Sequence, residues 1–235
     1  MPPTTAAKDI IDNELDLLAS LVSLDGKQVI ELGCGAAKLA RELLQRHPAS
    51  TVTGVEVDSR QHAKNLATPQ QGLVFLSGVA QAIPVGDAGH DLALMLKSLH
   101  HVPVTAMVSA LAEVARVLRP GGQLYVSEPI FDGALNEVTR LYNDEQVVRA
   151  AAQAALDCAI ANGSWTEVAV RRFVVPVHFA DFAEFEKRMV QQTYADHRLS
   201  ADTLARVRQT FESNLGAKGA DFLQPMHVRL LRPVN

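Results

Sequence analysis

Short apolar runs and helical periodicity alternate along the first half of the chain. The apolar runs are almost continuous, which indicates strands buried on both faces of a sheet. Between them, apolar residues recur every three or four positions, as they do on one face of a helix. Strands are predicted at 28–32, 51–57, 72–78, 91–96 and 123–127, and helices at 37–46, 59–66 and 104–118. This alternation predicts a doubly wound parallel sheet, a fold that binds ligands at the carboxyl ends of its strands.

The pattern changes after Pro129, where helices predominate. Pro176 lies inside a predicted strand and favours a sheet edge or a bulge there, because proline has no N–H to donate. A further amphipathic helix at 8–24 precedes the first strand and ends at Asp25-Gly26. In the second half, helices are predicted at 136–160, 181–195 and 201–215, and strands at 171–179 and 226–231.

The segment QVIELGCGAAKLA, residues 28–40, joins the first strand to the next helix through a Gly-x-Gly turn. Glycine permits the backbone angles that such a turn needs and lets a ligand approach the main chain closely. The helix that follows directs its free N–H groups toward that ligand. Glu31 precedes the glycines in a central strand, where a buried carboxylate is costly unless it faces a cleft or a cation. This position favours a cationic ligand over a pyrophosphate.

The second predicted strand ends in Glu56, whose carboxylate can accept hydrogen bonds from both hydroxyls of a ribose. A solvated charge at a strand end is the alternative role for this residue. A plain connecting turn is likewise the alternative for the glycines. Together, the turn and the acidic strand end predict a nucleoside site.

Composition and charge narrow the function. The chain has 235 residues, of which 48% are hydrophobic and 20% charged, so it can form one substantial core. Its net charge is −4 and neither half is basic, so the overall electrostatic footprint of a nucleic-acid-binding protein is missing. Cys34 and Cys158 lie far apart, so we expect neither a metal site nor a disulfide framework. Without a signal-type segment or an apolar run of membrane-spanning length, a cytoplasmic protein is expected.

Five motifs occur in order between residues 27 and 130: ELGCG, GVEVD, SGVAQAIPV, HDLALMLKSLHHV and RVLRPGGQLYVSEP. The series resembles the class I S-adenosylmethionine-dependent methyltransferases, in particular the small-molecule enzymes of the type 11 group. The resemblance implies a Rossmann-like, seven-stranded sheet, mostly parallel with an antiparallel last strand. It also implies a single domain over 1–235, with an N-terminal helix (1–26), a cofactor-binding core (27–130), and a helical lid with the last two strands (131–235).

The resemblance places S-adenosylmethionine against the main chain of the glycine loop, with Glu31 near its ammonium group. Cys34 is then a small filler, because a nucleophilic thiol needs a neighbouring base or cation. Two positions depart from the family pattern. Ala37 replaces a third glycine, which is tolerable with helical angles, and Val79 replaces an acidic residue that holds the adenine amino group. The expected cofactor contacts are Glu31, Gly33, Cys34, Gly35, Lys38, Glu56, Val57, Gly78, Val79, Ala80 and Lys97.

His101 follows the fourth strand, where the resemblance places the substrate nucleophile. A pKa near neutrality suits histidine to take a proton from an oxygen or nitrogen nucleophile, whereas orienting the loop is the alternative role. His100 is a weaker candidate for the base. Glu128 ends the fifth strand and either lines the substrate site or bonds the backbone of the next loop. The expected substrate contacts are Glu128, Arg140, Tyr142 and His197.

The sequence therefore favours a methyltransferase that passes a methyl group, by in-line displacement, to a small organic acceptor. An acid would suit the arginines, and a tRNA or a protein is the second choice of acceptor. Two other classes stay open. An NAD-dependent oxidoreductase would share the loop and Glu56, but the third glycine is missing and Glu31 would repel a pyrophosphate. A cofactor-binding protein without transferase activity would be consistent with Val79.

Overall fold

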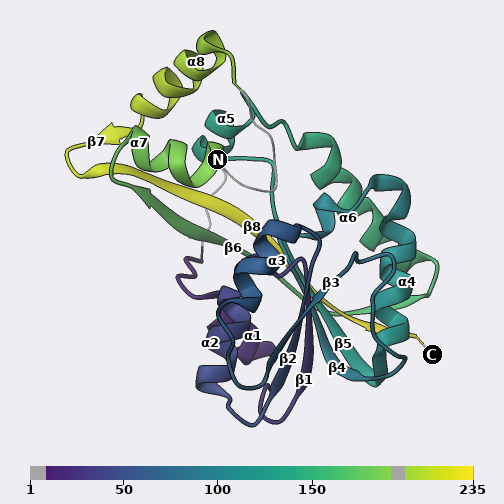
Figure 1. The fold of residues 1–235 in the computed structure, drawn as a ribbon. Coiled ribbons are helices and arrows are strands. Elements are labelled where there is room, and N and C mark those ends of the chain that lie inside the picture. Colours follow the sequence, from purple (N-terminus) through teal and green to yellow (C-terminus); the bar gives the residue numbers. More distant parts are fainter. Residues whose placement is uncertain (1–8, 192–198, 235) are drawn as a thin grey trace. The chain divides into compact units, whose positions relative to one another are not determined.

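The computed structural model describes residues 9–191 and 199–234 (Figure 1). These residues fall into two compact units. The first, here called the sheet unit, comprises 14–128, 146–170 and 228–234. The second, here called the accessory unit, comprises 9–13, 129–145, 171–191 and 199–227. None of the helices in these ranges has both the length and the hydropathy needed to cross a membrane.

A central sheet runs in the order β3-β2-β1-β4-β5-β8-β6. The pairs among β1 to β5 are all parallel, and the short β7 pairs antiparallel with β8. The predicted doubly wound, mostly parallel sheet with a late antiparallel strand is confirmed. The described residues form eight strands instead of the predicted seven, because the short β7 pairs with β8 outside the main order. The strands are β1 (Gln28–Leu32), β2 (Thr51–Glu56), β3 (Leu73–Ser77), β4 (His90–Leu96), β5 (Leu118–Pro129), β6 (Trp165–Phe179), β7 (Leu215–Gly216) and β8 (Gly219–Pro233).

The strand order reverses between β1 and β4, because β2 and β3 lie on one side of β1 and the later strands lie on the other. In a doubly wound sheet this reversal opens a crevice at the carboxyl ends of the strands, where ligands bind. β6 is the last strand in the order, so the edge position predicted from Pro176 is confirmed. The fold therefore puts the glycine loop after β1 at the switch point.

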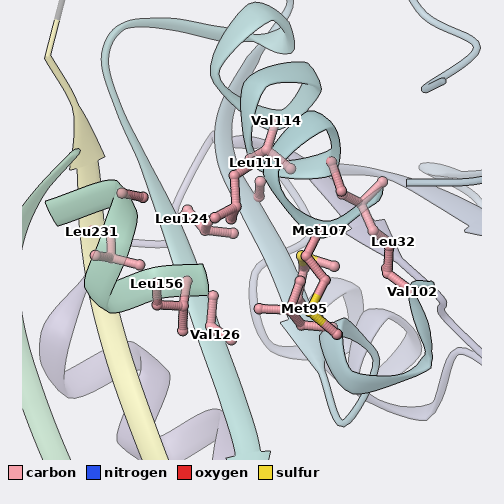
Figure 2. Close-up of a cluster of buried hydrophobic side chains, with 14 of the residues drawn as sticks. Leu32, Met95, Val102, Met107, Leu111, Val114, Leu124, Val126, Leu156 and Leu231 are labelled. Carbon is pink, nitrogen blue, oxygen red and sulfur yellow. The ribbon is translucent and has the colours of Figure 1, made fainter. Parts of the chain in front are cut away.

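One face of the sheet packs against two helices through a buried apolar cluster (Figure 2). Leu111 and Val114 come from α4, Leu156 comes from α6, and they meet Leu124 and Val126 of β5. All five side chains are almost completely buried, which is the main source of stability for such a layer. The helices of the sheet unit are α1 (Glu14–Leu21), α2 (Lys38–Arg46), α3 (Ser59–Leu66), α4 (Met107–Val117) and α6 (Gln146–Ala161), with 3₁₀ turns η1 (Leu99–His101) and η2 (Val104–Ala106).

Several predicted boundaries were wrong. The single helix predicted at 136–160 is two helices, α5 (Ala134–Thr139) and α6. Asn143 and Asp144 lie in the break, and side chains of this type compete with the helix for backbone hydrogen bonds. The helix predicted at 8–24 has its described α-helical part only at α1, and the helix predicted at 104–118 begins with the turn η2. The strands predicted at 123–127 and 226–231 are central parts of the longer β5 and β8.

The accessory unit has an aromatic core. Phe179, Phe182, Phe185, Phe211 and Phe222 are buried together, with ring centroids 4.9 to 6.0 Å apart among the closest pairs. The helix predicted at 181–195 is found as the short α7 (Phe182–Phe185) and a π-helical turn, η3 (Glu186–Val190), while 192–195 lie outside the described residues. The helix predicted at 201–215 is confirmed in substance as α8 (Ala201–Glu212).

Candidate cofactor and active site

The loop between β1 and α2 adopts left-handed backbone angles at three positions. Gly33 has φ 71°, Gly35 has φ 51°, and Ala37 has φ 53° with ψ 37°. A Cβ atom on Gly33 would lie 2.8 Å from the Cβ of Ser98, so only glycine fits at that position. The sequence led us to expect helical angles at Ala37. The structure gives left-handed ones, and Ala37 is the N-cap residue that precedes α2. Left-handed angles cost a non-glycine residue about 1–2 kcal/mol, so this loop holds strain.

Hydrogen bonds from neighbouring elements fix this loop. The N–H groups of Gly33 and Cys34 both donate to the Val55 carbonyl oxygen, at 2.9 and 3.1 Å. The Asn65 side chain of α3 donates to the Gly35 carbonyl oxygen at 2.7 Å. Asn65 is the only buried residue of α3, so no apolar pattern in the sequence marked it as part of the site.

Glu56 ends β2 and holds the same loop. Its Oε2 accepts the N–H of Gly35 at 2.7 Å, and its Oε1 accepts the N–H of Asp58 at 2.8 Å. The side chain is buried, at 6% exposure. A carboxylate offers about four lone-pair positions, so each oxygen retains one for another donor. The geometry therefore suits a pair of ribose hydroxyls. The adjacent Val57 is exposed.

Glu31 is the most perturbed carboxyl group of this region. It lies in β1 at 4% exposure, and its Oε2 has no hydrogen-bond partner among the described residues. Burial, with the nearby charges of Glu14 and Glu56, raises its pKa to about 8. An unpartnered buried carboxyl oxygen is costly, and a cationic donor would relieve that cost. The residues of the loop thus fit a ligand that carries an ammonium group and a ribose.

Cys34 and Lys38 flank the loop without forming a reactive centre. The Cys34 thiol is buried, and burial raises its pKa, as do the charges of Glu31 and Glu56. The thiolate is therefore disfavoured, which supports a filler role for this residue. Lys38 is the first residue of α2 and is exposed.

The segment after β3 carries the residues expected near the adenine. The N–H of Gly78 donates to the Glu56 carbonyl oxygen at 3.2 Å, and a Cβ atom here would lie 2.8 Å from the Pro84 ring. Val79 accepts a backbone hydrogen bond from Ala82 at 3.2 Å. Ala80 is half-buried against the apolar cluster of Figure 2. Apolar and main-chain atoms of Gly78, Val79 and Ala80 therefore form this part of the site, while the Glu113 carboxylate accepts the N–H of the nearby Ile83 at 3.0 Å.

The end of β4 is tied to its neighbours by main-chain contacts. Lys97 has φ 54° and an exposed side chain, and its N–H donates to the Ser127 carbonyl oxygen at 2.7 Å. The Ser98 hydroxyl donates to the Leu32 carbonyl oxygen at 2.8 Å. A left-handed lysine at a strand end is a second point of backbone strain beside the glycine loop.

The two histidines of η1 differ in their surroundings. His100 is buried, and its Nδ1 bonds the Oε2 atom of Glu128. The other oxygen of Glu128 accepts the N–H of Leu99 at 2.8 Å, and Glu128 itself has no exposed surface. His101 is exposed, and its ring centroid lies 4.1 Å from that of His100. Glu128 thus positions the turn that carries both histidines.

Two further predicted substrate contacts, Arg140 and Tyr142, belong to the accessory unit. Arg140 is exposed, pairs with Glu137 at 3.4 Å, and lies over the Phe131 ring. The Tyr142 hydroxyl donates to the Met189 carbonyl oxygen at 3.2 Å. His197 lies outside the described residues. Glu31, Glu56 and the loop therefore belong to one unit with His101 and Glu128, whereas Arg140 and Tyr142 do not.

Residues 29–122 match the family model described as "Methyltransferase domain". This segment is a class I methyltransferase domain. The resemblance predicted from the five motifs is therefore confirmed, and the matched segment runs from β1 into β5. The glycine loop, Glu56, Lys97 and His101 all lie within the methyltransferase domain.

Curated relatives of the methyltransferase domain include enzymes named for lipids. A fatty-acid O-methyltransferase from Mycolicibacterium smegmatis is 38% identical over 111 residues, which are 44% of this chain and 38% of that protein. Phthiotriol/phenolphthiotriol dimycocerosates methyltransferase 1 from Mycobacterium ulcerans is 38% identical over 120 residues, 47% of this chain and 40% of that protein. The chain thus spans less than half the length of these two relatives.

Solved structures extend the likeness of fold beyond the methyltransferase domain. The YcgJ protein of Bacillus subtilis superposes with a TM-score of 0.63 over 92% of this chain and 95% of that one. At 19% identity, this likeness concerns the fold alone.

Proposed function

We propose that the protein is an S-adenosylmethionine-dependent O-methyltransferase that acts on a small organic acceptor. The observation that carries the proposal is the pair of buried carboxyl groups beside the strained glycine loop. Glu56 has capacity for two ribose hydroxyls, and Glu31 has an oxygen without a partner among the described residues. These groups lie in a methyltransferase domain, which supports this cofactor over NAD.

The residues have distinct roles in this proposal. The main chain of Gly33 to Gly35 holds the cofactor, Glu31 its ammonium group and Glu56 its ribose. Gly78, Val79 and Ala80 cover the adenine, while Lys38, Val57 and the main chain at Lys97 complete the contacts. When bound, the cofactor supplies an electrophilic methyl group on a positive sulfur, which an acceptor displaces in line. The chain contributes alignment and a site from which water is excluded.

His101 is the proposed general base. A hydroxyl acceptor must lose a proton as its oxygen is methylated, and an imidazole near that oxygen can take it. Glu128 positions His101 indirectly, through its bonds to Leu99 and His100. A carboxylate acceptor is already ionised, so it needs no base. We also propose that Arg140, Tyr142 and His197 contact the substrate. The helices between the last two long strands form a lid over the substrate side in this proposal, and the enzyme works in the cytoplasm.

The first experiment measures cofactor binding by calorimetry. S-adenosylmethionine and S-adenosylhomocysteine should bind the wild type, and Glu56→Ala should weaken both about tenfold, which is about 1.4 kcal/mol, because the ribose loses its acceptor. Glu42→Ala is the matched control, since it removes an exposed carboxylate from α2. If the wild type binds neither ligand, the proposal is overturned.

The second experiment measures transfer of a labelled methyl group to fatty acids, phenols and aliphatic alcohols. His101→Ala should lower kcat by about 100-fold with a hydroxyl acceptor, the ordinary contribution of a general base, and by less than twofold with a carboxylate. His47→Ala is the control, because His47 pairs with Asp25 at the surface. Cofactor binding without transfer to any acceptor would favour a binding protein over an enzyme.

A further inference from the structure

The N-terminal helix brings a second carboxyl group to the face of the sheet that carries Glu31. In the parallel register, Glu31 pairs with Leu94 and Leu94 pairs with Tyr125. Residues in register across parallel strands point to the same face, so the side chains of Glu31 and Tyr125 share one face. The Tyr125 hydroxyl donates to Oε1 of Glu14 at 3.3 Å. The Glu14 carboxyl group, at the start of α1, therefore lies on the same face of the sheet as Glu31 and Tyr125.

Glu14 is surrounded by polar groups from the strand ends. Burial raises its pKa, whereas Ser127, Lys97 and Tyr125 lower it. Its charge also raises the pKa of Glu31, so the two carboxyl groups lie close enough to repel each other. No motif of the sequence assigned Glu14 a role.

One buried carboxyl oxygen in this place lacks a partner. Glu31 Oε2 has none among the described residues, whereas the fully buried Ser127 hydroxyl interacts with Glu14. Buried polar atoms are normally hydrogen-bonded, so an unpartnered oxygen beside a second carboxyl group points to a ligand. A cationic donor suits this place, because its positive charge favours the ionised form of both carboxyl groups, and ionised carboxylates only accept hydrogen bonds.

We propose that Glu14 and Glu31 together bind the α-ammonium group of S-adenosylmethionine, so that Glu14 is a further cofactor-binding residue. This assignment rests on the proposed function. Glu56 ends β2, Glu31 lies in β1, and Glu14 lies over β5, in the order in which these strands follow across the sheet. A ligand whose ribose contacts Glu56 therefore extends its amino-acid end toward Glu14. An ammonium group has three N–H donors for these acceptors, whereas a sulfonium has none.

The test compares three ligands by calorimetry on the wild type and on Glu14→Gln, which keeps the shape and removes the charge. S-adenosylmethionine and S-adenosylhomocysteine both carry the ammonium group, and 5′-methylthioadenosine lacks it. We expect Glu14→Gln to weaken the first two about tenfold and to leave the third within twofold. Asp16→Asn is the matched control, since it removes an exposed carboxylate from the same helix.

Each other result overturns the assignment. Equal loss for all three ligands means that Glu14 only supports the fold, and a loss for S-adenosylmethionine alone means that it faces the sulfonium. Unchanged affinity for all three removes Glu14 from the site while leaving the proposed function intact. If the wild type binds none of the ligands, the proposed function fails and the assignment fails with it. Glu56→Ala should weaken all three, because each ligand carries the ribose.

Discussion

The two units differ in where they place polar groups. Among the described residues, every buried polar or charged side chain except Asn136 belongs to the sheet unit. The accessory unit instead holds every phenylalanine except Phe75, and five of them form its core. The three described non-glycine residues with left-handed angles, Ala37, Ala88 and Lys97, are also in the sheet unit. Both units have a buried apolar core, but the sheet unit also buries polar and strained groups, which cost free energy unless the surrounding structure or a ligand compensates them.

The largest effect is expected in the accessory unit. Phe211 is fully buried and contacts the rings of Phe179, Phe182, Phe185 and Phe222. Phe211→Ala should lower the free energy of unfolding by about 4 kcal/mol, because it leaves a cavity. Denaturant unfolding measures this loss, and Phe211→Leu should recover most of it. Because no proposed cofactor contact lies in this unit, the affinity of the folded variant for the cofactor should stay within twofold. A parallel loss of affinity would contradict the separation of roles.

The second effect is a pH dependence of stability in the sheet unit. The pKa of Glu31 is raised to about 8 from an ordinary value of 4.5, so the folded state holds a proton that the unfolded state releases. This contribution is complete below pH 4.5 and is lost as the pH rises through about 8. Because one pKa unit is worth about 1.4 kcal/mol, the free energy of unfolding should fall by roughly 3 kcal/mol from pH 5 to pH 8.

The matched variant isolates this residue. Glu31→Gln cannot titrate at this position. The melting temperature of the wild type should therefore rise relative to that of the variant as the pH is lowered from 8 to 5. A bound cationic ligand should flatten the wild-type curve above neutral pH, because it stabilises the ionised carboxylate. Parallel curves for the two proteins would show that Glu31 is not the group responsible.

The smallest effect concerns strain. Ala37→Gly relieves about 1–2 kcal/mol of left-handed strain, but it loses a buried methyl group worth about 0.8 kcal/mol and adds backbone freedom to the unfolded chain. The free energy of unfolding should therefore stay within about 0.5 kcal/mol of the wild type. Ala36→Gly is the control, since Ala36 is exposed and has ordinary angles, and it should destabilise by about 0.4–1 kcal/mol. A larger loss of unfolding free energy for Ala37→Gly than for Ala36→Gly would contradict the inference that Ala37 is strained.

The sequence by itself determined the features that depend on local pattern. The apolar runs specified β1 to β4, the Gly-x-Gly turn specified the strained loop, and the motif order specified the methyltransferase domain. The burial cost of a carboxylate in a central strand also marked Glu31 before any contact was known. Such signals lie within a few residues of each other, so no long-range contact is needed to detect them.

Only the tertiary structure decided which distant groups meet. Tyr125 and Glu14 are 111 positions apart, Asn65 and Gly35 are 30 apart, and His100 and Glu128 are 28 apart. Each pairing depends on strand order and helix placement, which bring residues together without any periodic trace in the sequence. The left-handed angles of Ala37 have the same origin, because the contacts of the neighbouring strands and helices hold the loop in a conformation that alanine alone would avoid.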